Sequence, residues 1–278
     1  MKVLITFGED QPTEVADLAI DGVRTDVPPE GDLTAFIQPL VGVPLDFCFI
    51  LHDIARNQPL LDAMAATEFD TSRTYIEPFN EREQGRVTPE VMIEGVNAVY
   101  HDCYARGFLG RIVASGDSNL DDPALRFYRK VCPKIPSDCV VAFHDYPRGT
   151  QPEHKPWHRT HERDLELFLD CLKGGQTPAC SEFGFHMAEE DHRGTPVRLA
   201  EGDVYCILYE YLRRHARYDL LFTTIYQFRD GPSEDFLGRF GLHAQDGTRK
   251  RQAYVVGDWK AEPAAACRDG EWKADPSV

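Results

Sequence analysis

The sequence predicts an α/β fold, a single (β/α)8 TIM barrel, and three observations lead to this prediction. Apolar runs typical of buried parallel strands alternate with helical segments through eight units, without a break in the pattern. Eight such units in 278 residues match the size of a closed barrel. The alternative, an open doubly wound sheet, usually has a glycine-rich phosphate turn after its first strand, whereas this turn reads Gly8-Glu9-Asp10-Gln11-Pro12.

The expected strands are short runs rich in β-branched and aromatic residues. They cover residues 3–8, 22–27, 45–51, the start of 74–83, 110–115, 139–144, 179–185 and 220–226. Helices are expected at residues 12–19, 32–40, 59–66, 88–104, 122–131, 160–172 and 201–215. Two helix starts are well marked, because Asp32 is a suitable N-cap and Thr88-Pro89-Glu90 supplies a capping residue, a first-turn proline and an acid.

The chain shows no internal boundary. No linker or low-complexity segment divides it, and 42% hydrophobic residues in a chain of this length can bury a sizeable core. We therefore expect one domain over residues 1–278, with the barrel at about 2–258 and a C-terminal tail at about 259–278.

The charge balance restricts the partners. The chain holds 46 acidic and 30 basic residues, a net charge of −16, which argues against nucleic acid or an anionic membrane surface as the main partner. No stretch approaches the length of about 18 apolar residues that a membrane span needs. A neutral, polar partner such as an oligosaccharide, a polysaccharide or a glycoside suits this balance, and the oligomeric state stays open.

The eight cysteines are scattered and include no Cys-x-x-Cys pair, so neither a zinc ribbon nor a disulfide framework is expected. Reduced thiols favour a cytoplasmic location, and no cofactor is expected. No signal peptide is visible, because the first residues run directly into a strand. A secreted protein trimmed of its leader would look the same.

In a closed barrel, the C-terminal ends of all the strands meet at one mouth, where such proteins place their ligands. The polar residues expected there are Glu9, Arg24, His52, Asn80, Glu81, Asp117, His144, Tyr146, Glu182, His186, Gln227 and Asp230. Two of the acids, Glu81 and Glu182, end the fourth and seventh strands and would face each other. A pair of carboxylates about 5 Å apart can open a glycosidic bond with retention of configuration. A single glutamate at a strand end is more often only a solvated acid.

The surroundings of the two glutamates make the pair more specific. The segment from Ile76 to Glu81 resembles the strand-four signature of clan A glycoside hydrolases, in which an Asn-Glu pair ends the strand. Ser181-Glu182-Phe183-Gly184 resembles their strand-seven signature. The resemblance implies that Glu81 is the general acid and base, that Glu182 is the nucleophile, and that Asn80 binds the 2-hydroxyl of the sugar.

Three further matches follow the order of the same family. Arg24 ends the second strand, where the resemblance implies an arginine that keeps the nucleophile ionised. His144-Asp145-Tyr146 resembles the His-x-Tyr of many members, in which the tyrosine steadies the nucleophile. The segment 226–231, with Tyr226 and Gln227, resembles the end of strand eight, and residues 240–242 and 250–254 resemble the last conserved segment. These matches add Arg24, His144, Tyr146, Tyr226 and Gln227 to the expected substrate-binding residues.

Two departures from the family accompany these matches. Many members have tryptophan near the end of strand eight, where this chain has Tyr226 or Phe228. The Asn-Glu pair is usually followed by proline, and here Arg82 follows it. Trp157, which we expect ahead of a helix beginning at Thr160, is a candidate platform for stacking against a sugar ring.

The sequence therefore predicts a retaining β-glycosidase in which Glu182 stays ionised and Glu81 starts protonated. Glu77, although close to this pair in sequence, is expected to point elsewhere and to be structural. Two alternatives stay open: a metal-dependent sugar isomerase or lyase on the same barrel, and a carbohydrate-binding barrel without catalysis. The histidines at 154, 158 and 161 do not have the spacing of a metal site on one helical face.

Overall fold

The computed structural model describes residues 1–7, 15, 18–80, 87–116, 120–146, 157–185, 201–230 and 240–261, and of 157–161 and 201–203 it describes only the backbone. The strands form a closed barrel in which each strand pairs with its neighbours in chain order, from β1 to β8. β1 closes the barrel by pairing in parallel with β8, with Leu4 opposite Thr224. The predicted fold, a single (β/α)8 barrel, is confirmed.

The strands lie close to their predicted positions. They are β1 (Lys2–Phe7), β2 (Gly22–Asp26), β3 (Asp46–Ile50), β4 (Thr74–Glu77), β5 (Arg111–Ala114), β6 (Val140–His144), β7 (Thr177–Phe183) and β8 (Phe222–Ile225). All of the neighbouring pairs are parallel, so the C-terminal ends of the strands meet at the same end of the barrel.

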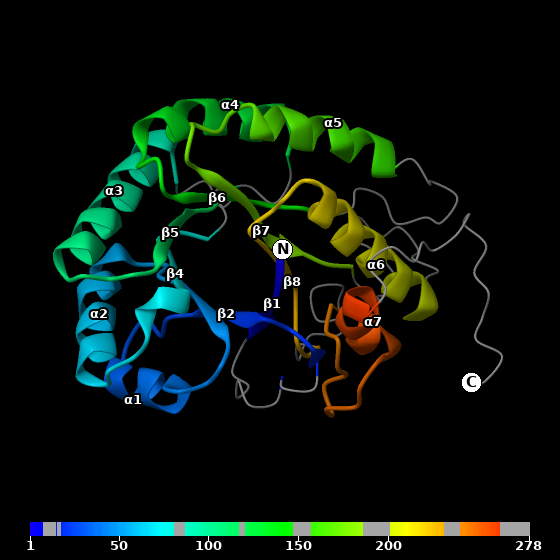
Figure 1. Ribbon diagram of the computed structural model, residues 1–278, viewed down its shortest axis with the longest axis horizontal. Coiled ribbons are helices and arrows are strands. Elements are labelled where there is room, and N and C mark those ends of the chain that lie inside the picture. Colours follow the sequence, from blue (N-terminus) through cyan, green and yellow to red (C-terminus); the bar gives the residue numbers. More distant parts are fainter. Residues whose placement is uncertain are drawn as a thin grey trace.

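Helices surround the sheet, as Figure 1 shows. They are α1 (Leu33–Ile37), α2 (Asn57–Ala66), α3 (Pro89–Ala105), α4 (Asp122–Val131), α5 (Trp157–Leu169), α6 (Glu201–Arg217) and α7 (Val255–Ala261). The predicted caps are confirmed, because the side chains of Asp32 and Thr88 accept hydrogen bonds from the amides of Thr34 and Val91. α5 begins at Trp157 rather than at Thr160. Most of the helix expected at 12–19 lies outside the described residues.

The core has two layers, because successive strand side chains point to opposite faces of the sheet. The large outer layer lies between the sheet and the helices. The inner layer fills the inside of the barrel and consists of Leu4, Cys48, Tyr75, Val113, Val140, Ala142, Ala179 and Phe222, all buried. Polar side chains replace this apolar filling toward the C-terminal ends of the strands.

At the opposite end of the barrel, Asp46 at the start of β3 is fully buried. Its carboxylate accepts a hydrogen bond from Arg73 Nε at 2.8 Å and another from Lys2 Nζ. Both basic side chains are more than 40% exposed, at 44% and 43%. The floor of the barrel thus contains a buried acid whose charge is balanced by two side chains that water also reaches.

A β-bulge interrupts β7 near its C-terminal end. Phe143 and His144 of β6 are neighbours in sequence, but they pair with Cys180 and Glu182. On the other side, Cys180 pairs with Thr223 and Phe183 with Ile225. β7 therefore holds one residue more than each of its neighbours over this stretch, and such an insertion redirects side chains.

The bulge turns two consecutive side chains toward the inside of the barrel. Cys180 and Phe183 belong to the outer core layer. Between them, Ser181 Oγ lies 3.0 Å from Ser115 Oγ, and Glu182 accepts a hydrogen bond from Arg24. A regular strand would have sent one of these two side chains toward the helices.

The segment after β8 is fastened to the barrel by a buried ion pair. Lys250 Nζ lies 2.7 Å from Asp230 Oδ1, and the same oxygen accepts a hydrogen bond from the Gly241 amide at 2.9 Å. Trp259 of α7 packs against the outer core and is 8% exposed. The seven cysteines in the described part are buried free thiols. None of the described helices combines the length and the hydropathy that a membrane crossing requires.

Candidate active site

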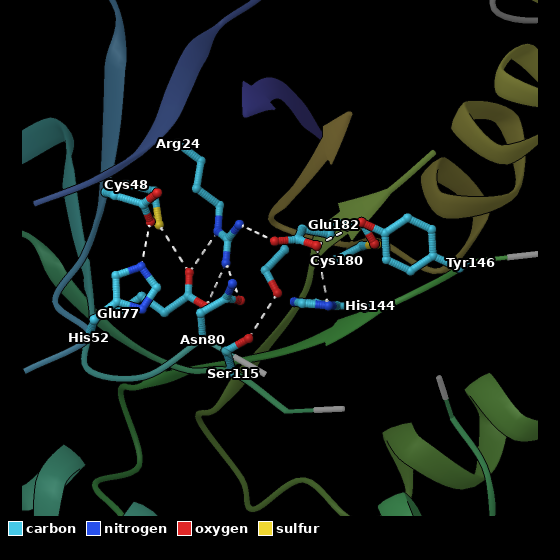
Figure 2. A network of polar contacts seen from close by, with 12 residues as sticks. Arg24, Cys48, His52, Glu77, Asn80, Ser115, His144, Tyr146, Cys180 and Glu182 are labelled. Atoms are coloured by element: carbon cyan, nitrogen blue, oxygen red, sulfur yellow. Dashed lines mark hydrogen bonds and ion pairs between the residues drawn. The ribbon is translucent and has the colours of Figure 1, made fainter. Parts of the chain in front are cut away.

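Arg24 of β2 lies at the centre of a buried polar network, shown in Figure 2. Its Nε and Nη2 donate to the two carboxylate oxygens of Glu77, at 2.8 and 2.9 Å. Nη2 also donates to Asn80 Oδ1 at 2.9 Å, and Nη1 donates to Glu182 Oε1 at 2.5 Å. One fully buried guanidinium therefore joins the ends of β2, β4 and β7. The planar fork of arginine suits this task, since it binds one carboxylate with two parallel hydrogen bonds.

Burial by itself acts to lower the pKa of Arg24, but the two carboxylates outweigh it. Glu77 makes the larger electrostatic contribution and Glu182 the second, and together they hold the pKa well above its ordinary value. Arg24 is therefore a permanent cation at this position.

Glu182 is held on its other side by residues at the end of β6. Tyr146 Oη donates to Glu182 Oε2 at 2.7 Å, and His144 Nδ1 lies 3.4 Å from the same oxygen. Glu182 is 4% exposed. Burial acts to raise the pKa of its carboxyl, but the attraction of His144 and Arg24 and the hydrogen bonds from Tyr146 and Arg24 outweigh burial. The pKa of Glu182 lies below its ordinary value, so the group is a carboxylate at neutral pH.

Glu77 corrects one expectation from the sequence. We expected it to point away from the site, but its carboxylate is fully buried against Arg24 inside the barrel. Cys48 Sγ lies below it and donates to Glu77 Oε2 at 3.7 Å. The alternation of side chains along a strand indicates this orientation. Tyr75 faces the inside of the barrel, and Glu77, two residues later, must face the same side.

The Asn-Glu pair that follows β4 is described only in part. Asn80 is partly buried and bound to Arg24 through its side-chain oxygen, so its amide group is oriented by the same guanidinium that holds Glu182. Glu81, the expected acid and base, lies outside the described residues. Its role stays a prediction from the sequence.

Three aromatic rings form a cluster that reaches Glu182 through the Tyr146 hydroxyl. Tyr146 contacts Tyr226, with ring centroids 6.3 Å apart, and both contact Phe240, at 5.8 and 5.4 Å. Gly184 permits this arrangement, because a Cβ there would lie 2.4 Å from the carbonyl oxygen of Tyr226. Sequence reasoning assigned Phe240 to a conserved segment but did not predict its contact with Tyr146.

For two expected substrate-binding residues, Gln227 and Trp157, the described part of the structure shows no side-chain contact with this network. Gln227 follows Tyr226 through a cis peptide bond, and its backbone carbonyl accepts a hydrogen bond from the Leu242 amide at 3.0 Å. Trp157 is the first residue of α5, and its side chain is not among those described. A role for either residue in binding stays a prediction.

Another pair of polar residues lies at the ends of β2 and β3. His52 Nε2 lies 2.7 Å from Asp26 Oδ1, and both side chains are more than half exposed. The hydrogen bond to Asp26 raises the pKa of His52 above its ordinary value. We expected His52 at the mouth, but its pairing with Asp26 was not foreseen. Among the described residues, no three His, Cys, Asp or Glu side chains are grouped so that they could hold a metal ion.

No family model matches the sequence, and no curated protein matches it. Solved structures do resemble the fold. A glycoside hydrolase family 17 β-1,3-glucanosyltransferase from Rhizomucor miehei superposes with a TM-score of 0.67 and 11% identity, over 91% of this chain and 96% of that one. A triple mutant of an endo-β-1,4-glucanase from Xanthomonas axonopodis pv. citri gives 0.61 and 12% identity, over 93% and 98%.

A third solved structure is similar over part of a longer protein. This is a GH2 β-galacturonidase from Eisenbergiella tayi, with a TM-score of 0.63 and 16% identity, and it covers 92% of this chain but 49% of that one. At these identities the comparisons establish the fold and not the chemistry. The chain shares its closed eight-stranded barrel fold with these glycoside hydrolase structures, as its alternation of strands and helices predicted.

Proposed function

We propose that this protein is a retaining β-glycosidase, with Glu182 as the nucleophile and Glu81 as the general acid and base. One observation supports this proposal above the others. The carboxylate of Glu182 is buried at the end of β7 and is held ionised by Arg24, His144 and Tyr146. A buried carboxylate stabilised in this way is suited to attack an electrophilic carbon, because it needs no loss of a proton first.

The first step of the proposed mechanism breaks the glycosidic bond. An oxygen of Glu182 forms a bond to the anomeric carbon while the bond from that carbon to the leaving oxygen breaks. Glu81 gives its proton to the leaving oxygen, so the aglycone departs as a neutral alcohol. The negative charge of Glu182 is consumed in the ester, and Glu81 becomes the carboxylate.

The second step restores the enzyme. Glu81 takes a proton from a water molecule while the oxygen of that water attacks the anomeric carbon. The ester bond from this carbon to Glu182 then breaks. Glu182 returns to a carboxylate that Arg24 and Tyr146 again stabilise. Two displacements at the same carbon leave the product with the configuration of the substrate.

The solved neighbours support a carbohydrate as the ligand. The Rhizomucor miehei enzyme has been solved as an active-site mutant in complex with laminaritriose. A β-glucuronidase from Ruminococcus gnavus has been solved in complex with D-glucuronic acid. Tyr146 contacts Glu182 and packs against Tyr226 and Phe240, and an aromatic cluster of this kind suits the apolar face of a sugar ring.

The product configuration tests this proposal directly. We expect the protein to hydrolyse at least one member of a panel of aryl β-glycosides and to release the β-anomer first, as proton NMR of the fresh product measures. A chelator should leave the rate unchanged. Release of the α-anomer first would contradict retention, and loss of activity with the chelator would favour the metal-dependent isomerase or lyase. Glycan binding without turnover of any substrate would favour the binding protein.

Replacing Glu81 by alanine tests the assignment of the acid. We expect hydrolysis of an alkyl or phenyl β-glycoside to fall by about 10²-fold or more, since general acid catalysis contributes about this much. A dinitrophenyl glycoside, whose leaving group needs no proton, should still form the glycosyl-enzyme rapidly, seen as a burst of the phenol. Azide should then release a β-glycosyl azide. Equal losses on both substrates, without a burst, would contradict the role of Glu81.

A further inference from the structure

A second buried polar cluster lies behind the end of β6, on the side that faces helix α6. Asp145 Oδ2 accepts hydrogen bonds from Arg214 Nη2 and from His215 Nε2, the latter at 3.0 Å. His215 Nδ1 in turn lies 2.7 Å from Thr223 Oγ1 of β8. All four residues are at most 5% exposed. The cluster therefore connects the end of β6, helix α6 and strand β8 without access to water.

Asp145 stands between the two residues that contact the carboxylate of Glu182. His144 precedes it and Tyr146 follows it, and both reach Glu182 Oε2. The backbone amide of Asp145 also donates to the carbonyl oxygen of Glu182, at 2.8 Å. Its side chain points the other way, to α6. A displacement of Asp145 would thus move the Tyr146 hydroxyl relative to the Glu182 carboxylate.

The charges of Asp145, Arg214 and His215 determine which atom donates and which accepts in each hydrogen bond of this cluster. Burial lowers the pKa of His215 well below its ordinary value, and the neighbouring Arg214 lowers it further. His215 is therefore neutral, so Nε2–H donates to Asp145 and Nδ1 accepts from the Thr223 hydroxyl. Arg214 supplies the positive charge opposite Asp145, and its guanidinium lies over the ring of Tyr211, 4.4 Å from the centroid. A buried aspartate without these partners would be strongly unfavourable.

We propose that Arg214 and His215 are positioning residues for the nucleophile: from helix α6 they hold Asp145, and through it they keep Tyr146 and His144 against the Glu182 carboxylate. The proposal rests on the proposed role of Glu182 in catalysis. The positioning itself is a property of the protein without substrate, so it can be measured separately.

The test compares Arg214→Met with Arg213→Met. Arg213 is the preceding residue of the same helix, and its partly exposed side chain pairs with Glu210 at 3.4 Å. We expect Arg214→Met to raise the titration midpoint of Glu182, followed by carbon-13 NMR of the glutamate carboxyls, by about half a pH unit or more, because the stabilising Tyr146 hydrogen bond is lengthened. The acidic limb of the kcat/KM profile should move by the same amount. Arg213→Met should change neither.

Three further variants keep the test decisive. Tyr146→Phe removes the hydrogen bond itself and should shift the midpoint in the same direction and further than Arg214→Met. His215→Leu, which keeps the apolar contacts with Phe183 and Tyr211 but gives no hydrogen bond to Asp145, should shift it upward by a smaller amount. His215→Leu also carries the test if Arg214→Met does not fold. Arg214→Lys, which retains a cation, should restore most of the wild-type midpoint.

A purely structural role predicts a different result. In that case Arg214→Met and His215→Leu would lower the melting temperature, but the Glu182 midpoint and the acidic limb would stay at their wild-type values. That outcome would overturn the proposal. Because the NMR titration needs no turnover, an upward shift in a protein that hydrolyses no glycoside would retain the positioning role and reject the proposed function instead.

Discussion

Glu182→Ala is expected to reduce hydrolysis of a β-glycoside by at least roughly 10³-fold, which corresponds to about 4 kcal/mol of lost transition-state stabilisation. In the proposed mechanism, Glu182 forms the bond to the anomeric carbon, and the alanine removes this group. The protein should still fold, because Arg24 keeps its two hydrogen bonds to Glu77. Steady-state rates on an aryl glycoside with a good leaving group measure the loss.

Azide provides the diagnostic part of this experiment. The small anion can occupy the space that the Glu182 carboxylate leaves, attack the anomeric carbon from the same face, and give the α-glycosyl azide in one displacement. Glu210→Ala is the control, because Glu210 pairs with Arg213 on the surface of α6. This control should keep the wild-type rate and give no azide product. Full activity of Glu182→Ala without azide would show that the role of nucleophile belongs to another residue.

The second large effect is expected at Arg24. Arg24→Met leaves the carboxylates of Glu77 and Glu182 buried without their shared cation. Removing one partner of a buried ion pair costs about 3–5 kcal/mol, so we expect a loss of unfolding free energy of this size at pH 7. Any folded fraction should hydrolyse glycosides poorly, because the nucleophile then binds a proton more readily. Urea unfolding followed by circular dichroism measures the stability.

The loss at Arg24→Met should depend on pH in a defined direction. In the wild type, the pKa of Glu182 lies below its ordinary value, so the ionised group stabilises the fold above that value and this contribution fades as the pH falls. In the variant, burial without the cation raises the pKa of Glu182, and the penalty for the buried charge disappears once the group is protonated. The stability difference from wild type should therefore be largest at pH 7 and smaller near about pH 4.

Arg73→Met is the matched control for this prediction. Arg73 also pairs with a fully buried carboxylate, Asp46, but its side chain is 44% exposed and Asp46 keeps its contact with Lys2. We expect a loss of about 1 kcal/mol or less and an unchanged rate of hydrolysis. If Arg73→Met lost as much unfolding free energy as Arg24→Met, the burial of the Arg24 network would not explain the large effect expected at Arg24.

The fold could be predicted because its signals are local. Each strand is a short apolar run. Helices such as α1 and α3 follow capping residues in the sequence, and the structure confirms these residues as N-caps. Arg24 was expected at the site because it ends the second strand, where the family resemblance implies an arginine beside the nucleophile. Two helices begin earlier than expected, at Asn57 rather than residue 59 and at Trp157 rather than Thr160. Neither start has such a capping signal, because Arg56 and Pro156 precede them.

Other features depend on contacts between segments far apart in the sequence. Glu77 faces the inside of the barrel with Tyr75, but its partner Arg24 lies on another strand 53 residues earlier in the chain. Arg214 and His215 look like ordinary basic residues in the last turn of a helix, a common pairing with the helix dipole. Their contact with Asp145 cannot be recognised until α6 and the end of β6 are placed together. Glu81 and the side chain of Trp157 lie outside the described residues, so their places stay predictions from the sequence.

The bulge in β7 has a consequence for how this barrel could change its substrate. The backbone pairing of the bulge with β6 and β8 turns Glu182 toward the inside of the barrel, and hydrogen bonds from Arg24 and Tyr146 fix its carboxylate there. A side chain fixed in this way has little conformational entropy left to lose as a substrate enters. Divergence among barrels that share this arrangement is then expected in the loops around the mouth, while the backbone register at Glu182 is expected to tolerate neither insertion nor deletion.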